Sequence, residues 1–465
     1  MSNQGLFDEF PEVSAKQWKQ KIQFDLKGAD YNETLLWESL EGIKVKPFYH
    51  AEDLQNAKTF NLPKDHNWKI AQTIFVGDSK KANAKAIDCL KRGTESILFT
   101  IPNENINFQE LLSGIDLEHT PIHFNFQFLA VEPIKKLLEF TTGKKSEINL
   151  NIDLIANLIK DGNWFHNLEK DHSLLGEIYN QTSSKKGITA ISIDTSIYQN
   201  AGSSMVQQLA YGLAHANEYL NHFSSVTSSA VEKSFPITFK VSVGGNYFFE
   251  IAKLRALRWL WQSLRTEYGI ETDCHIMAIP SKRNKTLYDY NVNMLRTTSE
   301  CMSAILGGAD TVTNLPYDAI YHKDNEFGER IARNQLLLLK EESYFNQISK
   351  AAEGTYYIEH LTQQLAERAL ELFKQIENSG GFLSELKKGT IQRKIKENSE
   401  KEQQLFNTKE ITLVGTNKYQ NQQDQMKDDL ELYPFVKIQP RKTIIEPIIE
   451  KRLAETLEQK RLGDE

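Results

Sequence analysis

The amino-acid sequence predicts an α/β protein: a closed (β/α)8 TIM-type barrel with an N-terminal arm and a helical C-terminal extension. Three observations carry this prediction. Eight short β-branched or apolar runs follow one another between residues 68 and 316, segments of helical period lie between most of them, and nearly every connection is long enough for a crossover. A doubly wound open sheet is the alternative, but the glycine-rich fingerprint that it needs after an early strand is missing from the sequence.

Composition and charge restrict the class of protein. The chain carries 55 Lys and Arg against 62 Asp and Glu, and no basic block dominates, so we expect no nucleic-acid partner. No apolar stretch reaches about 18 uncharged residues, which predicts no membrane span. The acidic N-terminus lacks the apolar core of a signal peptide. Three widely spaced cysteines exclude a disulfide framework, so we expect a cytoplasmic protein.

Residues 1–67 precede the barrel and are predicted to form an arm. Ser14 and Gln17 have the spacing of a capping box, in which each side chain bonds the other's backbone N–H, so a helix is expected to begin there. The alternating segment 35–49 predicts a strand or arm that ends in a turn at Pro47. The arm has no evident core, so its large apolar groups should cover either this chain's barrel or, as we favour, a partner: Phe7, Phe10, Trp18, Trp37 and Phe48.

Residues 68–345 are predicted to form the barrel. Helical period is clearest in three connections, 79–93, 204–220 and 247–264. The first follows a capping Asp78, and the third is apolar around most of its circumference, which predicts a buried helix. The eight expected strands are 68–76, 96–101, 122–128, 148–155, 188–194, 236–243, 274–280 and 310–316.

Residues 346–465 are predicted to form the C-terminal extension. Helical patterns cover 355–382 and 387–405, after a helix over 327–345 that ends the barrel region. Segment 411–419 predicts a short strand, and 443–465 predicts a last helix. We expect no second α/β domain, because too few residues follow position 419.

Common catalytic and metal motifs are missing from the sequence. It has no P-loop, no dinucleotide fingerprint, no G-x-S-x-G, no H-E-x-x-H and no C-x-x-C. His119 and His123 stand four residues apart but bracket Pro121, so they do not share a helix face. We therefore expect no metal site.

Residues at the carboxyl ends of the predicted strands are the candidates for chemistry, because barrels keep their active sites there. Asp194 ends one strand and suits either a general acid or base or a cap of the next turn. Lys282 and Arg283 follow another strand. They are expected either to bind an anion such as phosphate or to belong to a solvated basic loop. We take Asp194, Lys282 and Arg283 as candidate ligand-binding residues. Gly307 and Gly308 precede the last strand, which predicts a structural turn at the opposite face.

Seven stretches in one order give the chain a family resemblance. It resembles the small (beta) subunit of methylmalonyl-CoA mutase, whose substrate domain is a (β/α)8 barrel. The stretches are 68–93, 191–205, 247–261, 304–318, 330–343, 351–381 and 414–419.

The resemblance implies that the catalytic residues of the family are missing. The catalytic subunit has Arg-Gln-Tyr where this chain has Ala71-Gln72-Thr73, and that tyrosine is catalytic. It has a catalytic histidine where this chain has Ile197. Isoleucine neither donates a hydrogen bond nor transfers a proton, so we expect no catalytic residue here.

The resemblance also implies where the cofactor is bound. Family members that bind adenosylcobalamin do so through D-x-H-x-x-G in a C-terminal domain. The near-match Asp273-Cys274-His275 lacks the glycine and begins a barrel strand, so we treat it as chance. We expect adenosylcobalamin in the partner subunit and none on this chain.

The function implied is that of a non-catalytic small subunit of a heterodimeric methylmalonyl-CoA mutase. Its large (alpha) subunit would interconvert methylmalonyl-CoA and succinyl-CoA, and the arm of this chain would wrap that partner. Two alternatives remain open. One is a stand-alone barrel that binds CoA thioesters or phosphorylated ligands, and the other is the small subunit of a different acyl-CoA mutase.

Overall fold

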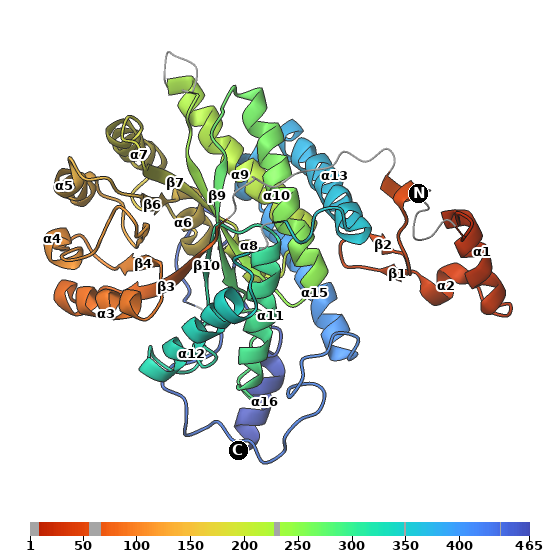
Figure 1. Cartoon of the computed structure of the whole chain (residues 1–465). Helices are drawn as coiled ribbons and strands as arrows, with labels where there is room; N and C mark the ends of the chain where they lie inside the picture. Colours follow the sequence, from red (N-terminus) through yellow and green to blue (C-terminus); the bar gives the residue numbers. More distant parts are fainter. Residues whose placement is uncertain (1–8, 55–66, 227–232, 348–349, 438) are drawn as a thin grey trace, which may run out of the picture.

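The structure, a computed structural model, describes residues 9–54, 67–226, 233–347, 350–437 and 439–465, and its centre is a closed barrel of eight parallel strands (Figure 1). Neighbouring strands follow one another in chain order, and the last strand pairs with the first. The predicted (β/α)8 barrel is therefore confirmed. Its strands are β3 (Lys69–Phe75), β4 (Ser96–Ile101), β5 (Ile122–Phe126), β6 (Ile148–Ile152), β7 (Ile188–Asp194), β8 (Ile237–Val243), β9 (Cys274–Pro280) and β10 (Thr311–Thr313).

Helices connect the strands and cover the outside of the barrel (Figure 1). Asp78 caps the first of them as predicted, because its side chain accepts a hydrogen bond from the backbone N–H of Lys81. The helices are α3 (Ser79–Lys91), α4 (Phe108–Leu111), α5 (Val131–Thr141), α6 (Leu154–Asp161), α7 (Leu168–Thr182), α8 (Ser196–Asn200), α9 (Met205–Val226), α10 (Tyr247–Glu267), α11 (Val292–Leu306) and α12 (Glu326–Leu337), which continues as a π-helical turn, Leu338–Glu342.

The inside of the barrel is polar. Phe239 of β8 packs against Trp261 of α10, with ring centroids 5.7 Å apart, so the alternate residues Thr238 and Lys240 point inward. His123 of β5 and His275 of β9 lie 5.5 Å apart although their strands are not neighbours, so they meet inside the barrel. The barrel interior thus holds hydroxyls, imidazoles and a lysine, which is unusual beside the branched apolar layers common in such barrels.

The run 148–155 was predicted as one strand, and this boundary is wrong. The strand β6 ends at Ile152, and α6 begins at Leu154. Asp153 separates them because its carboxylate accepts a hydrogen bond from the backbone N–H of Ala156 and so caps the helix.

The arm divides into an exposed part and a part packed on this chain. Its elements are α1 (Ala15–Asp25), α2 (Tyr31–Leu35), β1 (Trp37–Glu38), β2 (Lys44–Val45) and a 3-10 turn (Ala51–Leu54). The predicted capping box of Ser14 and Gln17 opens α1, which has no buried residue and projects from the body (Figure 1). In contrast, Ile43 is buried, and Trp37 meets Phe249 of α10 edge to face. Phe7 lies outside the described residues.

The C-terminal extension begins with three helices, α13 (Tyr356–Asn378), α14 (Phe382–Lys387) and α15 (Thr390–Asn407). The strand predicted over 411–419 is wrong: Gly415 adopts φ +81°, and its N–H bonds the carbonyl of Lys418, which makes a tight turn. The side chain of Asn417 bonds the backbone of Phe406, Ile411 and Leu413, which holds this turn closed.

The helix predicted over 443–465 is confined to α16 (Glu455–Asp464). Residues 443–454, here called the strap, run without helix across the carboxyl end of the barrel. Pro447 interrupts a helix, and the strap's backbone N–H groups bond barrel loops instead. Ile448 bonds Ile159, Lys451 bonds Asn200 and Leu453 bonds Arg283, at 2.8 to 3.0 Å.

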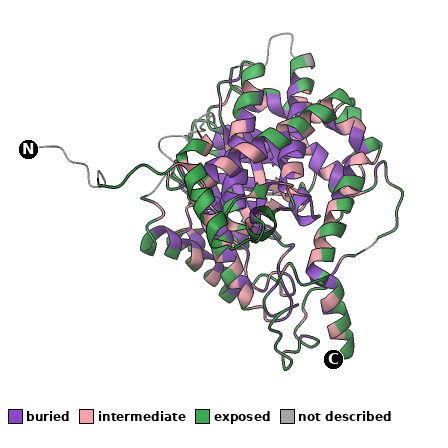
Figure 2. Cartoon of the chain, turned by 90° about the vertical axis from the view of Figure 1, so that its right-hand side faces the viewer, coloured by how far each residue is buried: buried purple, intermediate pink, exposed green. Residues whose placement is uncertain are grey.

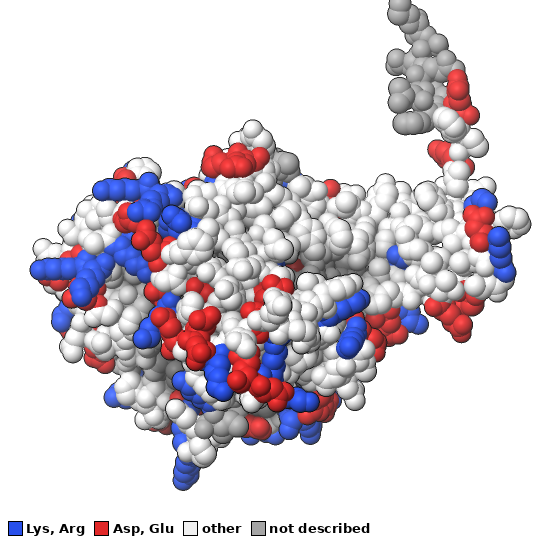
Figure 3. Space-filling view, turned by 90° about the horizontal axis from the view of Figure 1, so that it is seen from below, with Lys and Arg blue, Asp and Glu red and all other residues white. Residues whose placement is uncertain are grey.

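Buried residues gather in the centre of the body, around the barrel (Figure 2). On the face shown in Figure 3, Lys and Arg are interspersed with Asp and Glu. Among the described helices, none combines the length and apolar character needed to cross a membrane.

Candidate functional site

Asp194, at the carboxyl end of β7, is the centre of a charged cluster at the barrel mouth. The ammonium groups of Lys160 and Lys240 each lie 3.1 Å from its Oδ2. Its Oδ1 accepts hydrogen bonds from the hydroxyl and the backbone N–H of Ser196, so it also caps the turn that follows. The cluster joins three elements, because Lys160 lies on α6 and Lys240 on β8.

The charges around Asp194 decide what it can do. Burial alone would raise the pKa of Asp194, but Lys160, Lys240 and Ser196 outweigh burial and hold the pKa well below its usual range. The carboxylate therefore stays ionised at neutral pH and exchanges no proton there. This environment suits an anchor for two cations and does not suit a general acid or base.

Asp153 forms a second hub next to Asp194. Its carboxylate accepts hydrogen bonds from His215 at 2.8 Å, from Tyr219 at 2.9 Å and from the backbone N–H of Asp194 at 2.7 Å. His215 is fully buried, and its other ring nitrogen lies 3.1 Å from the hydroxyl of Tyr198. These contacts link Asp153, His215 and Tyr198 and so brace the loop that follows β7.

The loop after β7 folds into the short helix α8, and its side chains are packed into the protein core. Ile197 and Tyr198 are both fully buried. Gln199 bonds Glu250 and Lys253 of α10, at 2.9 and 2.6 Å. On the opposite side of the mouth, the hydroxyl of Thr73 lies 3.4 Å from that of Thr313. Neither Ile197 nor Thr73 brings an acidic or basic group to the barrel mouth.

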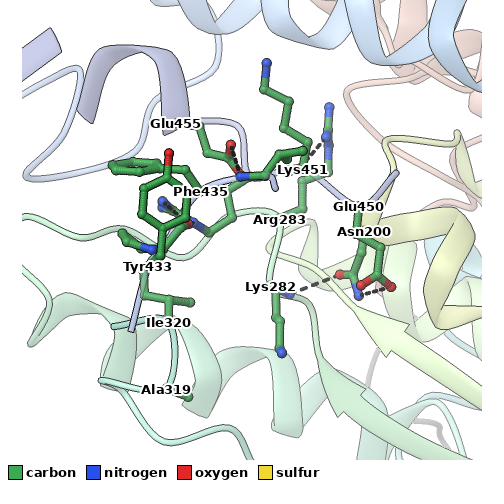
Figure 4. A pocket seen from close by; sticks show the side chains of 13 residues that line it. Asn200, Lys282, Arg283, Ala319, Ile320, Tyr433, Phe435, Glu450, Lys451 and Glu455 are labelled. Atoms are coloured by element: carbon green, nitrogen blue, oxygen red, sulfur yellow. Dashed lines mark hydrogen bonds between the residues drawn. The ribbon is translucent and has the colours of Figure 1, made fainter. Parts of the chain in front are cut away.

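The side chain of Arg283 binds residues of the C-terminal extension. Its guanidinium bonds Glu402 at 2.5 Å, Ser399 at 3.0 Å and the carbonyl of Lys451 at 2.8 Å. Lys282 bonds Asn200 through its backbone, and its side chain points away from the Arg283 guanidinium (Figure 4). Both residues line a cavity of about 210 Å³ that is shared with the strap and residues 433–436.

Asp194 lies in a different cavity from Lys282 and Arg283. That second cavity, of about 260 Å³, is lined by the carboxyl ends of β5, β6, β7 and β8 and by α6. The three ligand-binding candidates are thus not brought together in one pocket. Sequence reasoning missed Lys160, Lys240 and Asp153. Two signals were available: a lysine interrupts the apolar run ITFKVSV, and Asp153 directly follows the apolar run INLNI, much as Asp194 ends the next run.

The histidines make no metal site in the part of the chain that is described. His119 is exposed and pairs with Asp116, whereas His123 lies inside the barrel. Burial, with His275 and Lys240 nearby, lowers the pKa of His123 well below its usual value, so it is neutral near pH 7. His275 bonds the hydroxyl of Thr311 at 3.0 Å from within the barrel. No group of three metal-ligating side chains occurs among the described residues.

Comparisons with known proteins give a consistent match. The family model described as methylmalonyl-CoA mutase matches residues 103–456. The chain is 34% identical to the methylmalonyl-CoA mutase small subunit of Porphyromonas gingivalis, over 90% of this chain and 71% of that protein. It is 29% identical to the methylmalonyl-CoA mutase small subunit of Streptomyces virginiae, over 83% of this chain and 67% of that protein. It is 24% identical to the methylmalonyl-CoA mutase large subunit of the same organism, over 91% and 64%.

Proposed function

Because the chain belongs to the methylmalonyl-CoA mutase family, we propose that it is the non-catalytic small subunit of a heterodimeric mutase. The large subunit carries out the interconversion of methylmalonyl-CoA and succinyl-CoA and holds adenosylcobalamin. The identity is higher to the Streptomyces virginiae small subunit than to its large subunit, which supports the small-subunit role.

The observation that carries the proposal is the full burial of Ile197. By resemblance, this position holds the catalytic histidine in the large subunit. Here an apolar side chain packs into the core, and the surrounding loop is braced by Tyr198 and Gln199. Ile197 has no titratable group and faces the core, so it transfers no proton. This supports the interpretation that the barrel stabilises a partner and does not perform the reaction itself.

The exposed part of the arm supports a partner. Trp18 and Phe24 of α1 are 50% and 78% exposed, and α1 has no buried residue. Trp18 also stacks on Phe48 of the arm, with ring centroids 5.3 Å apart. Exposed apolar side chains on a projecting helix are typical of a protein interface. The arm is proposed to lie on the large subunit.

Co-expression with the large subunit tests the proposal. We expect the two chains to co-purify, with mutase activity and cobalamin absorbance in the complex and neither in this chain alone. Trp18→Ser with Phe24→Ser should weaken co-purification. Leu295→Ser, at a similarly exposed position on α11, is the matched control and should not.

Two results would overturn the proposal. One is mutase activity of the isolated chain with added cofactor. The other is tight binding of a CoA ester by the isolated chain, which would favour a stand-alone ligand-binding barrel.

A further inference from the structure

We propose that the interior of the barrel binds a column of water molecules, which runs from the cavity beside Asp194 down to His123. This cavity, here called the mouth cavity, is the one of about 260 Å³ that the carboxyl ends of β5 to β8 line. Barrels of this kind usually have an interior filled by branched apolar side chains. The water-binding site goes beyond the supporting role proposed above and does not depend on it.

Polar side chains alternate with apolar ones along four neighbouring strands. The alternation is visible in IHFNF of β5, INLNI of β6, ISID at the end of β7 and ITFKV of β8. Since successive residues of a strand point to opposite faces of the sheet, the polar residues of each strand share one face. Thr238 and Lys240 place that face inside the barrel, as does the contact of His123 with His275.

The inward polar residues form an upper and a lower layer. The lower layer contains His123, Asn149 and Thr238. Asn149 Oδ1 lies 3.5 Å from the hydroxyl of Thr238 although β7 separates their strands, so these side chains meet across the interior. The lower layer precedes the upper one by two residues on each strand, which is about 7 Å. The upper layer lines the mouth cavity and contains Asn125, Asn151, Ser192 and Lys240.

Buried polar atoms in both layers have no hydrogen-bond partner among the described residues. Each of the residues that carry them is more than nine-tenths buried. Native proteins bond such groups to protein or to ordered water, because a buried polar group without a partner costs free energy. The atoms are both ring nitrogens of His123, the amide nitrogen of Asn149, the amide oxygen of Asn151 and the hydroxyl of Ser192.

These atoms need a ligand that both donates and accepts hydrogen bonds. Burial, with His275 and Lys240 nearby, lowers the pKa of His123, so the ring is neutral near pH 7 and has one donor and one acceptor nitrogen. Asn149 adds a donor and Asn151 an acceptor. Water serves both kinds of group, and a bound water typically makes two to four such bonds.

The charged groups of the mouth cavity do not select an ion. Lys160 and Lys240 line it together with Asp153 and Asp194, so the formal charges of its wall balance. No third metal-ligating side chain joins the two barrel histidines in the described part of the chain. An uncharged ligand therefore suits the mouth cavity and the layer below it.

The backbone of β6 is adapted to this use. Asn151 adopts φ +48°, and the pairing of β6 with β7 shifts register between Asn149 and Ile152. A bulge of this kind re-aims side chains and is frequent beside functional sites. The amide nitrogen of Asn151 bonds the carbonyl of Phe124 at 3.0 Å, which fixes the amide and leaves its oxygen for water.

A crystal structure of the full chain, alone or with the large subunit, tests the proposal at a resolution that shows ordered water. We expect water within hydrogen-bond distance of both ring nitrogens of His123 and of the amide nitrogen of Asn149. This water should be continuous with water in the mouth cavity. A metal ion between His123 and His275, an organic molecule in the interior, or direct bonds from these nitrogens to other protein groups would overturn the proposal.

Magnetic relaxation dispersion of water measures in solution how many water molecules stay bound to the chain. His123→Phe and Asn149→Leu should each lower its amplitude by the equivalent of one water molecule per chain or more. Thr141→Val is the matched control and should leave the amplitude unchanged. Its hydroxyl is buried on α5, outside the barrel, and already bonds the carbonyls of Leu137 and Leu138.

Circular dichroism checks that each variant is folded. An unchanged amplitude in folded His123→Phe and Asn149→Leu would contradict the water column. The crystal structure of the unchanged chain decides the question if neither variant folds. Failure of this proposal leaves co-purification with the large subunit untouched, so the two proposals fail separately.

Discussion

Arg283 and Glu402 form an ion pair of 2.5 Å between the loop after β9 and helix α15. The arginine side chain is 7% exposed, and it also holds the strap through the carbonyl of Lys451. One side chain therefore connects the barrel mouth to two separate parts of the C-terminal extension.

Arg283→Ala should lower the free energy of unfolding by about 3 kcal/mol, because it leaves a partly buried carboxylate without its partner. Urea unfolding measures this loss. Arg441→Ala removes a more exposed ion pair with Asp161, 42% and 47% exposed, and should cost under about 1 kcal/mol. Equal losses in the two variants would contradict the structural role assigned to Arg283.

The low pKa of Asp194 makes its contribution to stability depend on pH in one direction. In the unfolded chain the pKa of this carboxylate is near 3.8, so as the pH falls the unfolded chain takes up a proton before the folded protein does. The contribution of Asp194 to stability is therefore present above about pH 4 and is lost as the pH falls below that value. Asp194→Asn should cost about 2 kcal/mol at pH 7. The difference in free energy of unfolding between this variant and the unchanged protein should stay constant down to about pH 4 and then decrease.

Urea unfolding between pH 3 and pH 8 checks this, with Asp25→Asn on the exposed face of α1 as the control. A difference that already narrows between pH 7 and pH 5 would contradict the paired state of Asp194.

Glu41 should anchor the arm to the barrel. Its carboxylate accepts the backbone N–H of Val206 at 3.0 Å, at the beginning of α9. A carboxylate at a helix N-terminus satisfies a free donor, so Glu41→Ala should cost about 1 kcal/mol. Limited trypsin digestion should then cut the arm faster. Glu38→Ala, exposed in the same hairpin, should change neither stability nor cleavage.

Ile197→His should destabilise the protein by about 3 kcal/mol, because a polar imidazole replaces a fully buried apolar side chain of the hydrophobic core. Ile197→Val, which keeps the apolar character, should cost about 1 kcal/mol. Thermal unfolding compares the two variants. A stable Ile197→His protein would show that the loop has room for the family's catalytic side chain.

The barrel could be predicted because its signals are local. Runs such as 96–101, 188–194 and 274–280 coincide with β4, β7 and β9, since β-branched residues bounded by turn residues specify strands without distant partners. The capping residues Ser14 and Asp78 were predicted for the same reason, because a cap involves only neighbouring residues.

The failures share a different cause. Segment 411–419 has the composition of a strand, but no strand among the described residues pairs with it, and the side chain of Asn417 closes it into a turn. The strap has apolar residues at helical spacing, yet its backbone bonds go to Ile159, Asn200 and Arg283. Distant partners decided both conformations.

The sequence by itself determined the order of strands and helices, the family, and the lack of titratable side chains at positions 73 and 197. The tertiary structure alone decided how the charged residues are used. Asp194, Lys282 and Arg283 look alike in sequence as polar residues at strand ends. In the folded protein, Asp194 is buried between two lysines and Arg283 forms an ion pair with Glu402. Lys282 lines a different cavity from the one that Asp194 lines. Charge pairing depends on groups that lie far apart along the chain, and local sequence patterns carry no information about such distances.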